Sequence, residues 1–497
     1  MIDPAGLQVL ASSLRGVAEE MGAALVRSAH SANIKERRDC STAVFDPDGR
    51  MIAQAEHMPV HLGAMPDAVA ACMRLDPRPG DLFCVNDPYT GGTHLPDITL
   101  VSVVGGLGLL VSRAHYADVG GMAPASLPVG ATELYQEGLI IPPVRLTPEV
   151  EQVILANMRN PRERRADLRA QAACHEIGER RLRALAERHG RRALLRGMAE
   201  LHAASCRRVR AAVARLPDGR HRAADVMEGD GVTAGDVPIV AEVIVRGDRL
   251  TVDFTGTAAQ RPGNVNCPIA VTRSAVHYVV RLVCDPDLPA AGGVEEAVTI
   301  AAPEGCLVNA RAPAAVVAGN VETSSRIVDV VLRAFAGFAE VPAMGQGTMN
   351  NITFGNHRFT HYETIAGGQG ACPNANGPSA VHVAMSNTLN TPVEALELAY
   401  PLRVERYALR LGSGGAGRFW GGDGVIREIT ALEPCRVSIV SERRARGPAG
   451  TRGGWPGSPG RNLVDGDEVP AKVTRALDAG ESVTIETPGG GGFGAPA

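Results

Sequence analysis

The strongest constraint on the fold of this chain is a helical, arginine-rich stretch set between two parts that are rich in strands. Residues 149–216 place alanine and leucine at helical spacing among many arginines, with breaks near Asn160–Pro161 and Gly190. On both sides of this stretch, short apolar runs alternate with loops dense in glycine, proline and aspartate. Because strand and helix do not alternate regularly, a doubly wound parallel sheet is disfavoured. We predict an α+β fold, a mixed multi-layer arrangement with β-rich N- and C-terminal parts and a helical middle segment.

Several individual elements follow from periodicity and turn residues. Apolar side chains recur at three- and four-residue steps over residues 5–32, which predicts a helix. STAVFD at 41–46, the turn PDGR and MIAQ at 51–54 predict a β-hairpin, and residues 237–257 read as strand, turn, strand. Changes of composition divide the chain into an N-terminal region (1–148), a helical segment (149–216) and a β-rich region with glycine loops (217–497).

Composition and charge exclude several classes of protein. Hydrophobic residues make up 45% of the 497 residues and charged residues 21%, which is typical of a folded globular chain. The net charge of −4 gives no support for binding to nucleic acid or to an anionic membrane, and the arginines of 149–216 form either a solvated face or a face for an acidic partner. Only Lys35 and Lys472 are lysines, so no Walker phosphate loop is present.

The sequence also carries no targeting or cysteine motif. No apolar run reaches about 18 residues, and the N-terminus has no basic segment ahead of an apolar one. The ten cysteines are dispersed without a CxxC pair, which disfavours a zinc ribbon or a disulfide framework. We therefore expect a cytoplasmic protein with no membrane partner.

Two HxxD motifs form the densest group of residues that could carry chemistry. His94 and Asp97 lie in NDPYTGGTHLPD, and His115 and Asp118 lie in AHYADVGG, each near paired glycines and the end of an apolar run. Two imidazoles and two carboxylates on neighbouring strand ends could coordinate Mn²⁺, Fe²⁺ or Zn²⁺. Hydrogen-bonded loop residues that hold the turns together are the alternative.

Further candidates lie in the charged loop KERRDC. Glu36 or Asp39 could supply another oxygen ligand, although ion pairing with the neighbouring Lys35 and arginines would also explain both. Cys40 follows the same loop, where nearby arginines would favour a thiolate, or it is simply a small buried residue at a strand start.

Polar residues bounded by glycine also occur in the second half of the chain. The segment AGNVETSSR offers a donor and acceptor set suited to a small amide or carboxylate ligand, or alternatively caps for the apolar helix that follows. Its candidate residues are Asn320, Glu322, Thr323, Ser324 and Arg326. The glycine runs at 367–370 and 489–492 could cradle a phosphate through backbone N–H groups, but they could equally form turns.

Long motifs along nearly the whole chain resemble one known family. NIKERRDCSTAVFD, NDPYTGGTHLPD, AHYADVGGMAP, GNVETSSRIVDV, GPSAVHVAMSNTLNTPVEALE and TPGGGGFG are similar to segments of the hydantoinase B/oxoprolinase family. That family includes N-methylhydantoinase B-type subunits, the C-terminal part of 5-oxoprolinases and the metal-bearing subunits of acetone carboxylases. The resemblance spans roughly residues 20 to 494.

The resemblance implies an activity and a partner. In the family, an A-type partner uses ATP to phosphorylate the substrate, and the B-type subunit completes hydrolysis or carboxylation. The length of this chain is similar to that of short hydantoinase B members, which favours opening of a hydantoin, oxoproline or lactam ring within a hetero-oligomer. A ketone carboxylase subunit and a non-catalytic scaffold for the A-type ATPase are the alternatives.

The resemblance also implies roles for the candidate residues. Matching positions give the metal ligands as Glu36, His94, Asp97 and His115, with Asp39 as the alternative carboxylate. On this reading His94 and His115 are catalytic through a Mn, Zn or Fe ion. Two further groups complete the expected site. Asp118 is expected to orient His115 or to act as a general base. Glu322 is expected to be a further catalytic residue that positions the substrate together with Asn320, and Thr323, Ser324 and Arg326 are expected to bind the substrate.

Overall fold

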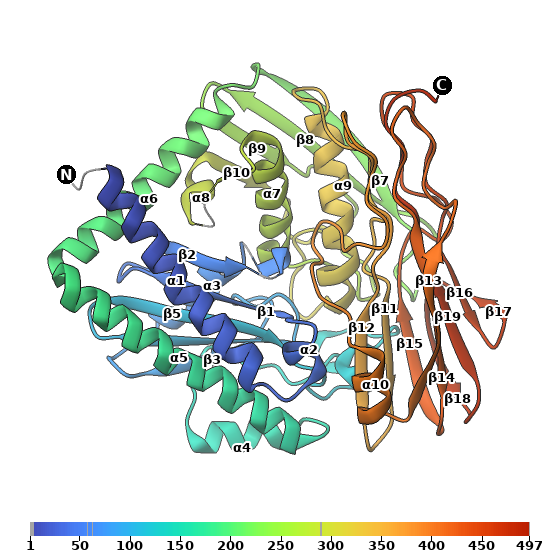
Figure 1. Cartoon of the computed structure of the whole chain (residues 1–497), viewed down its shortest axis with the longest axis horizontal. Coiled ribbons are helices and arrows are strands. Elements are labelled where there is room, and N and C mark those ends of the chain that lie inside the picture. Colours follow the sequence, from blue (N-terminus) through green and yellow to red (C-terminus); the bar gives the residue numbers. More distant parts are fainter. Residues whose placement is uncertain (1–3, 57, 62, 289–290, 497) are drawn as a thin grey trace.

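Helices and antiparallel sheets together make up the structure, a computed structural model that describes residues 4–56, 58–61, 63–288 and 291–496 (Figure 1). The first sheet has the strand order β2-β1-β5-β4-β3-β6, with every neighbouring pair antiparallel. Its strands are β1 (Cys40–Phe45), β2 (Met51–Glu56), β3 (Leu82–Val85), β4 (Asp97–Val104), β5 (Gly108–His115) and β6 (Val144–Arg145). The hairpin expected over 41–54 is confirmed as β1 and β2.

Both faces of the first sheet are buried. Along β1, Val44 packs with helix α1 (Pro4–Ser28), whereas Ala43 and Phe45 pack with helix α3 (Met65–Met73) on the opposite face. Helices α5 (Pro161–His189) and α6 (Arg191–Val213) lie beside α1 on the same side of the sheet (Figure 1). The alternation of side chains along each strand therefore feeds two separate hydrophobic cores.

The predicted helical stretch is confirmed, with its breaks at the expected proline and glycine. Helix α4 (Pro148–Ala156) precedes α5, which begins at Pro161, and α6 begins directly after Gly190. Most arginines of this segment are exposed, which agrees with a solvated face. None of the described helices is both long and apolar enough to cross a membrane.

The N-terminal helix ends earlier than its periodicity predicts. Helix α1 stops at Ser28, and a separate turn, α2 (Ala32–Lys35), follows it. The carboxylate of Asp167 accepts hydrogen bonds from the backbone N–H groups of His30 (2.8 Å) and Ser31 (3.0 Å). These N–H groups are therefore bonded outside the helix, and the chain turns at this point.

A second sheet lies beside the first and carries its own helices. Its order is β10-β9-β8-β7, with β9 and β10 parallel and joined through helices α7 and α8. The elements are β7 (Gly219–Met227), β8 (Val237–Arg246), β9 (Arg249–Asp253), α7 (Ile269–Cys284), α8 (Gly293–Ala297), β10 (Val298–Ala301) and α9 (Ser324–Phe335). The expected strand, turn, strand over 237–257 is confirmed as β8 and β9. The C-terminal turn of α6 joins this core, while its N-terminal half joins the core of the first sheet.

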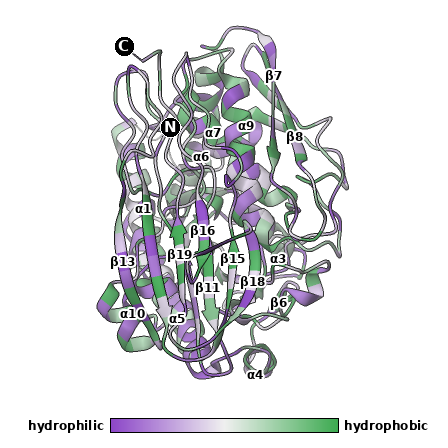
Figure 2. Ribbon diagram, turned by 90° about the vertical axis from the view of Figure 1, so that its right-hand side faces the viewer, coloured by the Kyte–Doolittle hydropathy of each residue, from purple (hydrophilic) through white to green (hydrophobic). Residues whose placement is uncertain are grey.

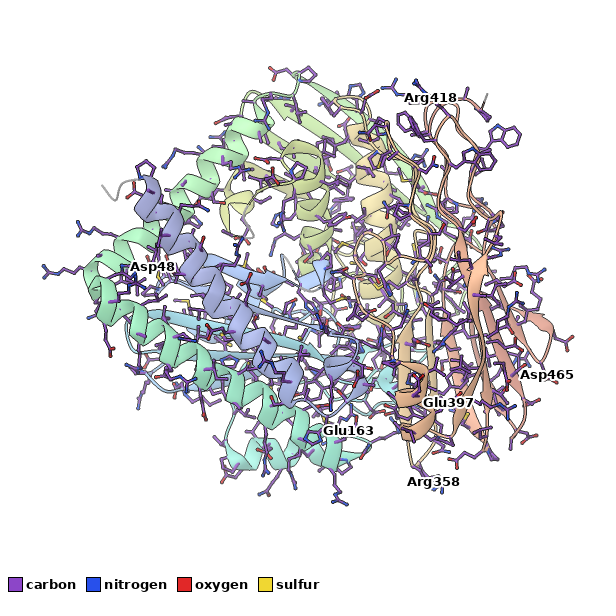
Figure 3. The ribbon with its side chains drawn as sticks, viewed as in Figure 1. Asp48, Glu163, Arg358, Glu397, Arg418 and Asp465 are labelled. Atoms are coloured by element: carbon purple, nitrogen blue, oxygen red, sulfur yellow. The ribbon has the colours of Figure 1, made fainter. Side chains whose placement is uncertain are left out.

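The C-terminal part is a sandwich of two antiparallel sheets, ordered β12-β11-β15-β18 and β13-β14-β19-β16-β17. Its elements are β11 (Asn351–Gly355), β12 (Thr360–Thr364), α10 (Val393–Ala399), β13 (Leu402–Arg410), β14 (Gly424–Ala431), β15 (Cys435–Val440), β16 (Arg461–Val464), β17 (Asp467–Val469), β18 (Lys472–Leu477) and β19 (Ser482–Glu486). Apolar side chains such as Phe354 and Ile485 fill the space between the sheets. Figure 2 shows hydrophilic and hydrophobic residues alternating along these strands, and Figure 3 shows Arg358, Glu397 and Asp465 pointing outward. These helices and mostly antiparallel sheets confirm the α+β expectation.

One end of the sandwich is built from extended glycine-rich loops without regular strands. We call this region the glycine lattice; it comprises residues 367–377, 412–423, 447–460 and 487–494. The N–H of Gly490 donates to Gly422 O (2.8 Å), and the N–H of Gly415 donates to Gly490 O (2.8 Å). The N–H groups of Gly368 and Gly491 likewise donate to backbone carbonyls of the chain. These N–H groups therefore hold the loops together. The possibility that they bind a phosphate is not supported, because they already donate to backbone carbonyls.

Candidate metal centre

The end of one strand and the start of its neighbour bring Asp97 and His115 face to face. Strands β4 and β5 are antiparallel, and Asp97 and His115 are partners in their register. His94 lies in the preceding loop, where the N–H of Asp97 bonds to the carbonyl of His94. The three side chains are at most 4% exposed, and their donor atoms converge at one point.

The spacing of these donor atoms fits a divalent metal ion. Asp97 Oδ1 lies 3.1 Å from His94 Nε2 and 3.0 Å from His115 Nδ1, and the two nitrogens lie 3.2 Å apart. Ligands about 2.1 Å from an ion and at right angles to each other are about 3.0 Å apart. Two imidazoles and one carboxylate suit Zn, Fe or Mn. The residues present therefore fit such an ion.

The carboxylate of Asp97 is held in its charged form. Burial by itself would raise the pKa of Asp97, but the neighbouring charge of His94 and hydrogen bonds from His115 and His61 outweigh it, and the pKa lies well below its usual range. His61 Nε2 lies 3.4 Å from Asp97 Oδ2, and Thr93 Oγ1 donates to the same oxygen at 2.5 Å. An ionised carboxylate is the form that binds a metal.

A tyrosine from the C-terminal sandwich closes the other side of the centre. The ring of Tyr362, on β12, stacks on His115 with centroids 4.6 Å apart and planes inclined by 24°. Arg37 lies over the same ring and donates from Nη1 to Tyr362 O at 2.8 Å. Tyr362 and His61 were missed by the sequence reasoning. Neither belongs to the HxxD motifs, and their approach depends on packing between distant segments.

Neither candidate carboxylate of the KERRDC loop, Glu36 or Asp39, belongs to the donor cluster. The donor atoms that converge at this centre belong to His94, Asp97 and His115. Asp39 is the nearer in the backbone, because its carbonyl accepts a hydrogen bond from the N–H of His115 at 3.0 Å, whereas Glu36 follows α2 and is half-buried. Burial raises the pKa of the Cys40 thiol, which disfavours a thiolate there.

The carboxylate of Asp118 is hydrogen-bonded within the loop that follows β5. Its Oδ1 accepts from the N–H of Gly120 (2.8 Å), its Oδ2 accepts from the N–H of Ala125 (2.9 Å), and Arg159 Nη1 donates to Oδ2 at 3.0 Å. These bonds hold the turn that follows β5. Within the part of the chain that the structure describes, no hydrogen bond joins this carboxylate to His115.

The candidate substrate-binding segment AGNVETSSR begins with a π-helical turn (Gly319–Thr323) that leads into α9. The hydroxyl groups of Ser324 and Thr323 donate to the carbonyls of Asn320 (2.6 Å) and Val265 (2.5 Å), so they do not cap the helix. Glu322 is fully buried, and burial raises its pKa to about 7. Asn320 Oδ1 and Glu322 Oε2 are buried and have no hydrogen-bond partner among the described residues. Such π-turns are common at functional sites.

A chain of contacts connects Glu322 with the donor cluster of His94, Asp97 and His115. Glu322 Oε1 accepts from Asn351 Nδ2 at 3.2 Å, and Asn351 Oδ1 accepts from the hydroxyl of Tyr362 at 2.7 Å. Because Tyr362 stacks on His115, the two halves of the chain meet at one place.

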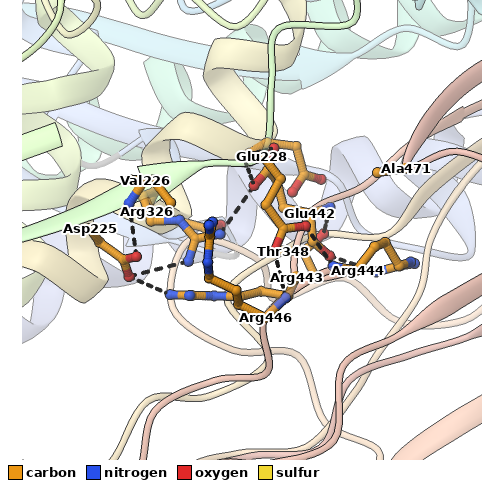
Figure 4. A network of polar contacts seen from close by, with 12 residues as sticks. Asp225, Val226, Glu228, Arg326, Thr348, Glu442, Arg443, Arg444, Arg446 and Ala471 are labelled. Atoms are coloured by element: carbon orange, nitrogen blue, oxygen red, sulfur yellow. Dashed lines mark hydrogen bonds and ion pairs between the residues drawn. The ribbon is translucent and has the colours of Figure 1, made fainter. Parts of the chain in front are cut away.

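Arg326 lies instead in a buried ionic network (Figure 4). Its guanidinium is 0% exposed and lies 3.3 Å from Glu442 and 3.4 Å from Asp329. Glu442 also pairs with Lys472, and Arg443 pairs with Asp329 at 2.6 Å. The network joins α9 to the sandwich, so the charge of Arg326 is already balanced by protein carboxylates.

Comparisons with known proteins agree on one protein family. The sequence model of the hydantoinase B/oxoprolinase family matches residues 3–496. An uncharacterized protein of Methanocaldococcus jannaschii is 38% identical over 100% of this chain and 91% of its own length. 5-Oxoprolinase 1 of Arabidopsis thaliana is 38% identical over 99% of this chain but only 42% of its own length. The chain thus spans about two fifths of that 5-oxoprolinase.

Solved structures share the fold from end to end. The ATP-dependent caprolactamase from Pseudomonas jessenii superposes with a TM-score of 0.91 at 27% identity, covering 100% of this chain and 92% of that one. Nucleotide-free acetone carboxylase shares the fold with a TM-score of 0.88 at 18% identity, covering 99% and 76%. Because the family model and these relatives cover nearly every residue, the resemblance seen in the motifs is confirmed, and the chain belongs to the hydantoinase B/oxoprolinase family.

Proposed function

We propose that this chain is the metal-bearing part of an ATP-dependent cyclic-amide hydrolase. It opens a hydantoin, oxoproline or lactam ring that an A-type partner subunit has phosphorylated with ATP, in a cytoplasmic hetero-oligomer. The convergence of His94, Asp97 and His115 carries the proposal. Relatives named 5-oxoprolinase and ATP-dependent caprolactamase support the class of substrate.

In the proposed site, the donor cluster binds the metal ion and the π-turn binds the substrate. His94, Asp97 and His115, with Asp39 or Glu36 as a further ligand, would hold a Mn, Zn or Fe ion, which would supply Lewis acidity and lower the pKa of a bound water. Tyr362 fixes the plane of the His115 ring by stacking. Asp118 supports the loop after β5 through its hydrogen bonds.

The π-turn supplies polar groups for the substrate. Asn320 Oδ1 and Glu322 Oε2 are buried acceptors without a partner among the described residues, and an amide N–H of the substrate would satisfy either of them. Thr323 and Ser324 hold the turn in shape through their bonds to backbone carbonyls. Arg326 contributes through the ionic network that anchors α9, so its effect on the substrate is indirect.

Carboxylation is the second candidate, because acetone carboxylase shares the fold. The two reactions are separated by supplying labelled bicarbonate to the complex with its A-type partner, since only carboxylation moves the label into product. A non-catalytic scaffold predicts no stoichiometric metal and full turnover after loss of His94.

The first experiment is elemental analysis of the purified chain without chelator. We expect at least one equivalent of Mn, Zn or Fe in the wild type and in a His357→Ala control, because His357 is exposed and lies outside the cluster. His94→Ala is expected to bind one equivalent of metal less than the wild type and to lose the ring-opening activity of the complex. The same metal content in His94→Ala and wild type, or no metal in the wild type after reconstitution, would overturn the proposal.

A further inference from the structure

A second group of metal-binding side chains lies between helices α6 and α8. His202 and Cys206 are four residues apart on α6, so they share one face of that helix, and each is 7% exposed. Glu296 reaches them from α8. His202 Nδ1 lies 3.7 Å from Glu296 Oε1 and 3.8 Å from Cys206 Sγ, and one donor atom from each residue lies within 4.8 Å of the others.

Backbone packing holds the three side chains together. A Cβ atom at Gly293 would collide with Ser205 and Cys206, so α8 can approach α6 this closely only because glycine stands there. The N–H of Gly292 also donates to the carbonyl of Met51 on β2 at 3.0 Å. Figure 1 shows α8 enclosed between α6 and the sheets. The backbone of α8 is therefore fixed next to α6, and His202, Cys206 and Glu296 lie close together because of this packing.

We propose that His202, Cys206 and Glu296 bind a Zn²⁺ ion. Imidazole nitrogen, thiolate and carboxylate are the three ligand types that zinc uses in proteins, and three protein ligands leave a fourth position for water. Tetrahedral ligands at zinc distances are about 3.3 to 3.6 Å apart. The two separations from His202 Nδ1 are a few tenths of an ångström longer, and the Glu296 side chain, which is 52% exposed, is free to move closer.

The surroundings leave room for the fourth ligand. A cavity of about 330 Å³ borders the three residues and is also lined by Arg50, Arg207 and Arg210. The charge of Arg50 is balanced by Asp46 and Asp48 of the same hairpin loop. A thiolate and a carboxylate would balance the two charges of the ion.

Binding of Co²⁺ in place of Zn²⁺ distinguishes the proposed zinc site from the His94, Asp97 and His115 cluster. The His94, Asp97 and His115 cluster contains no sulfur, so a thiolate-to-cobalt charge-transfer band can arise only where Co²⁺ meets a cysteine. We expect about one equivalent of Co²⁺ to produce this band in the full chain and Zn²⁺ to displace it. His94→Ala should keep the band, and loss of the proposed hydrolase activity would not affect it.

Three variants complete the test. Cys206→Ser should abolish the band, whereas the matched control Cys372→Ser, at a half-buried thiol elsewhere, should keep it. Glu296→Gln changes a half-exposed side chain and removes the carboxylate ligand. It should weaken Co²⁺ binding at least 10- to 100-fold, the range found when only a group that hydrogen-bonds to a metal ligand is removed. No band in the wild type, a band that survives Cys206→Ser, or unchanged affinity in Glu296→Gln would overturn the site.

Discussion

Replacing Gly490 by alanine tests how tightly the glycine lattice is packed. A Cβ atom at this position would collide with the carbonyl group of Gln369 and would lie 2.7 Å from the nitrogen of Gly370. Both contacts are with backbone, so no side chain can rotate away to make room. The loops would have to separate, and the hydrogen bonds that join them would lengthen.

The expected loss follows from packing and hydrogen bonding. Overpacking of a well-packed region costs about 1–3 kcal/mol. Gly490 donates to Gly422 O and accepts from the N–H of Gly415, each at 2.8 Å, and each such bond contributes about 0.5–1.5 kcal/mol. We therefore expect Gly490→Ala to lower the free energy of unfolding by about 2–6 kcal/mol.

Tryptophan fluorescence in a urea titration measures this loss at the right place. The chain has 2 tryptophans, and Trp420 and Trp455 accept hydrogen bonds from the N–H groups of Gly377 and Gly492 within the lattice. Gly16→Ala is the matched control, because an alanine Cβ in the middle of α1 meets nothing within 4 Å and should stabilise the helix by about 0.5–1 kcal/mol. A Gly490→Ala variant within about 0.5 kcal/mol of wild type would refute the reasoning.

Three further predictions concern buried polar groups. Glu442→Gln should lower the free energy of unfolding by about 3–5 kcal/mol in urea, because Lys472 is left in a buried site without its carboxylate. Burial raises the pKa of Glu137 from 4.5 to about 8, so the folded chain holds this proton more tightly than the unfolded chain and loses stability as the pH rises through that range. Glu137→Gln, with its carbonyl oxygen in place of the bonded carboxylate oxygen, should remove up to about 1.4 kcal/mol of this loss per pH unit in urea titrations at several pH values. Tyr362→Ala should weaken metal binding at His115 about 10- to 100-fold by calorimetric titration, because the ring no longer holds the imidazole.

Exposed counterparts serve as controls for these variants. Glu468→Gln should change neither the free energy of unfolding nor its pH dependence, and Tyr135→Ala, at a side chain that is 67% exposed, should leave metal affinity unchanged. A stable Glu442→Gln variant would show that the network is already hydrated. A pH slope identical in Glu137→Gln and wild type, or full metal affinity in Tyr362→Ala, would contradict the other two arguments.

Local patterns in the sequence were sufficient for much of the fold. The hairpin of β1 and β2 follows from alternating strands around PDGR, and the breaks between α4, α5 and α6 follow from Pro161 and Gly190. The end of α1 could not be predicted, because it depends on Asp167, which lies 137 residues from the N–H group of His30 that it binds. Periodicity contains no information on such a contact.

The candidate site was predictable to the extent that it depends on neighbouring strands. His94, Asp97 and His115 meet because antiparallel pairing brings the start of β4 opposite the end of β5. The expected role of Asp118 beside His115 was based on their spacing of three residues, but local hydrogen bonds turn its carboxylate into the following loop. Tyr362 is brought in by packing of the sandwich, which no motif near the histidines signals.

The stacking of Tyr362 on His115 has a consequence for the order in which the protein is made. His94, Asp97 and His115 leave the ribosome long before β12, so a nascent chain can form the donor cluster while one of its walls is missing. Until β12 packs against the cluster, the imidazole of His115 lacks its stacking partner, and Arg37 lacks the tyrosine carbonyl that it binds in the finished structure. The candidate metal centre therefore reaches its final form only once residue 362 has been synthesised and the sandwich has docked.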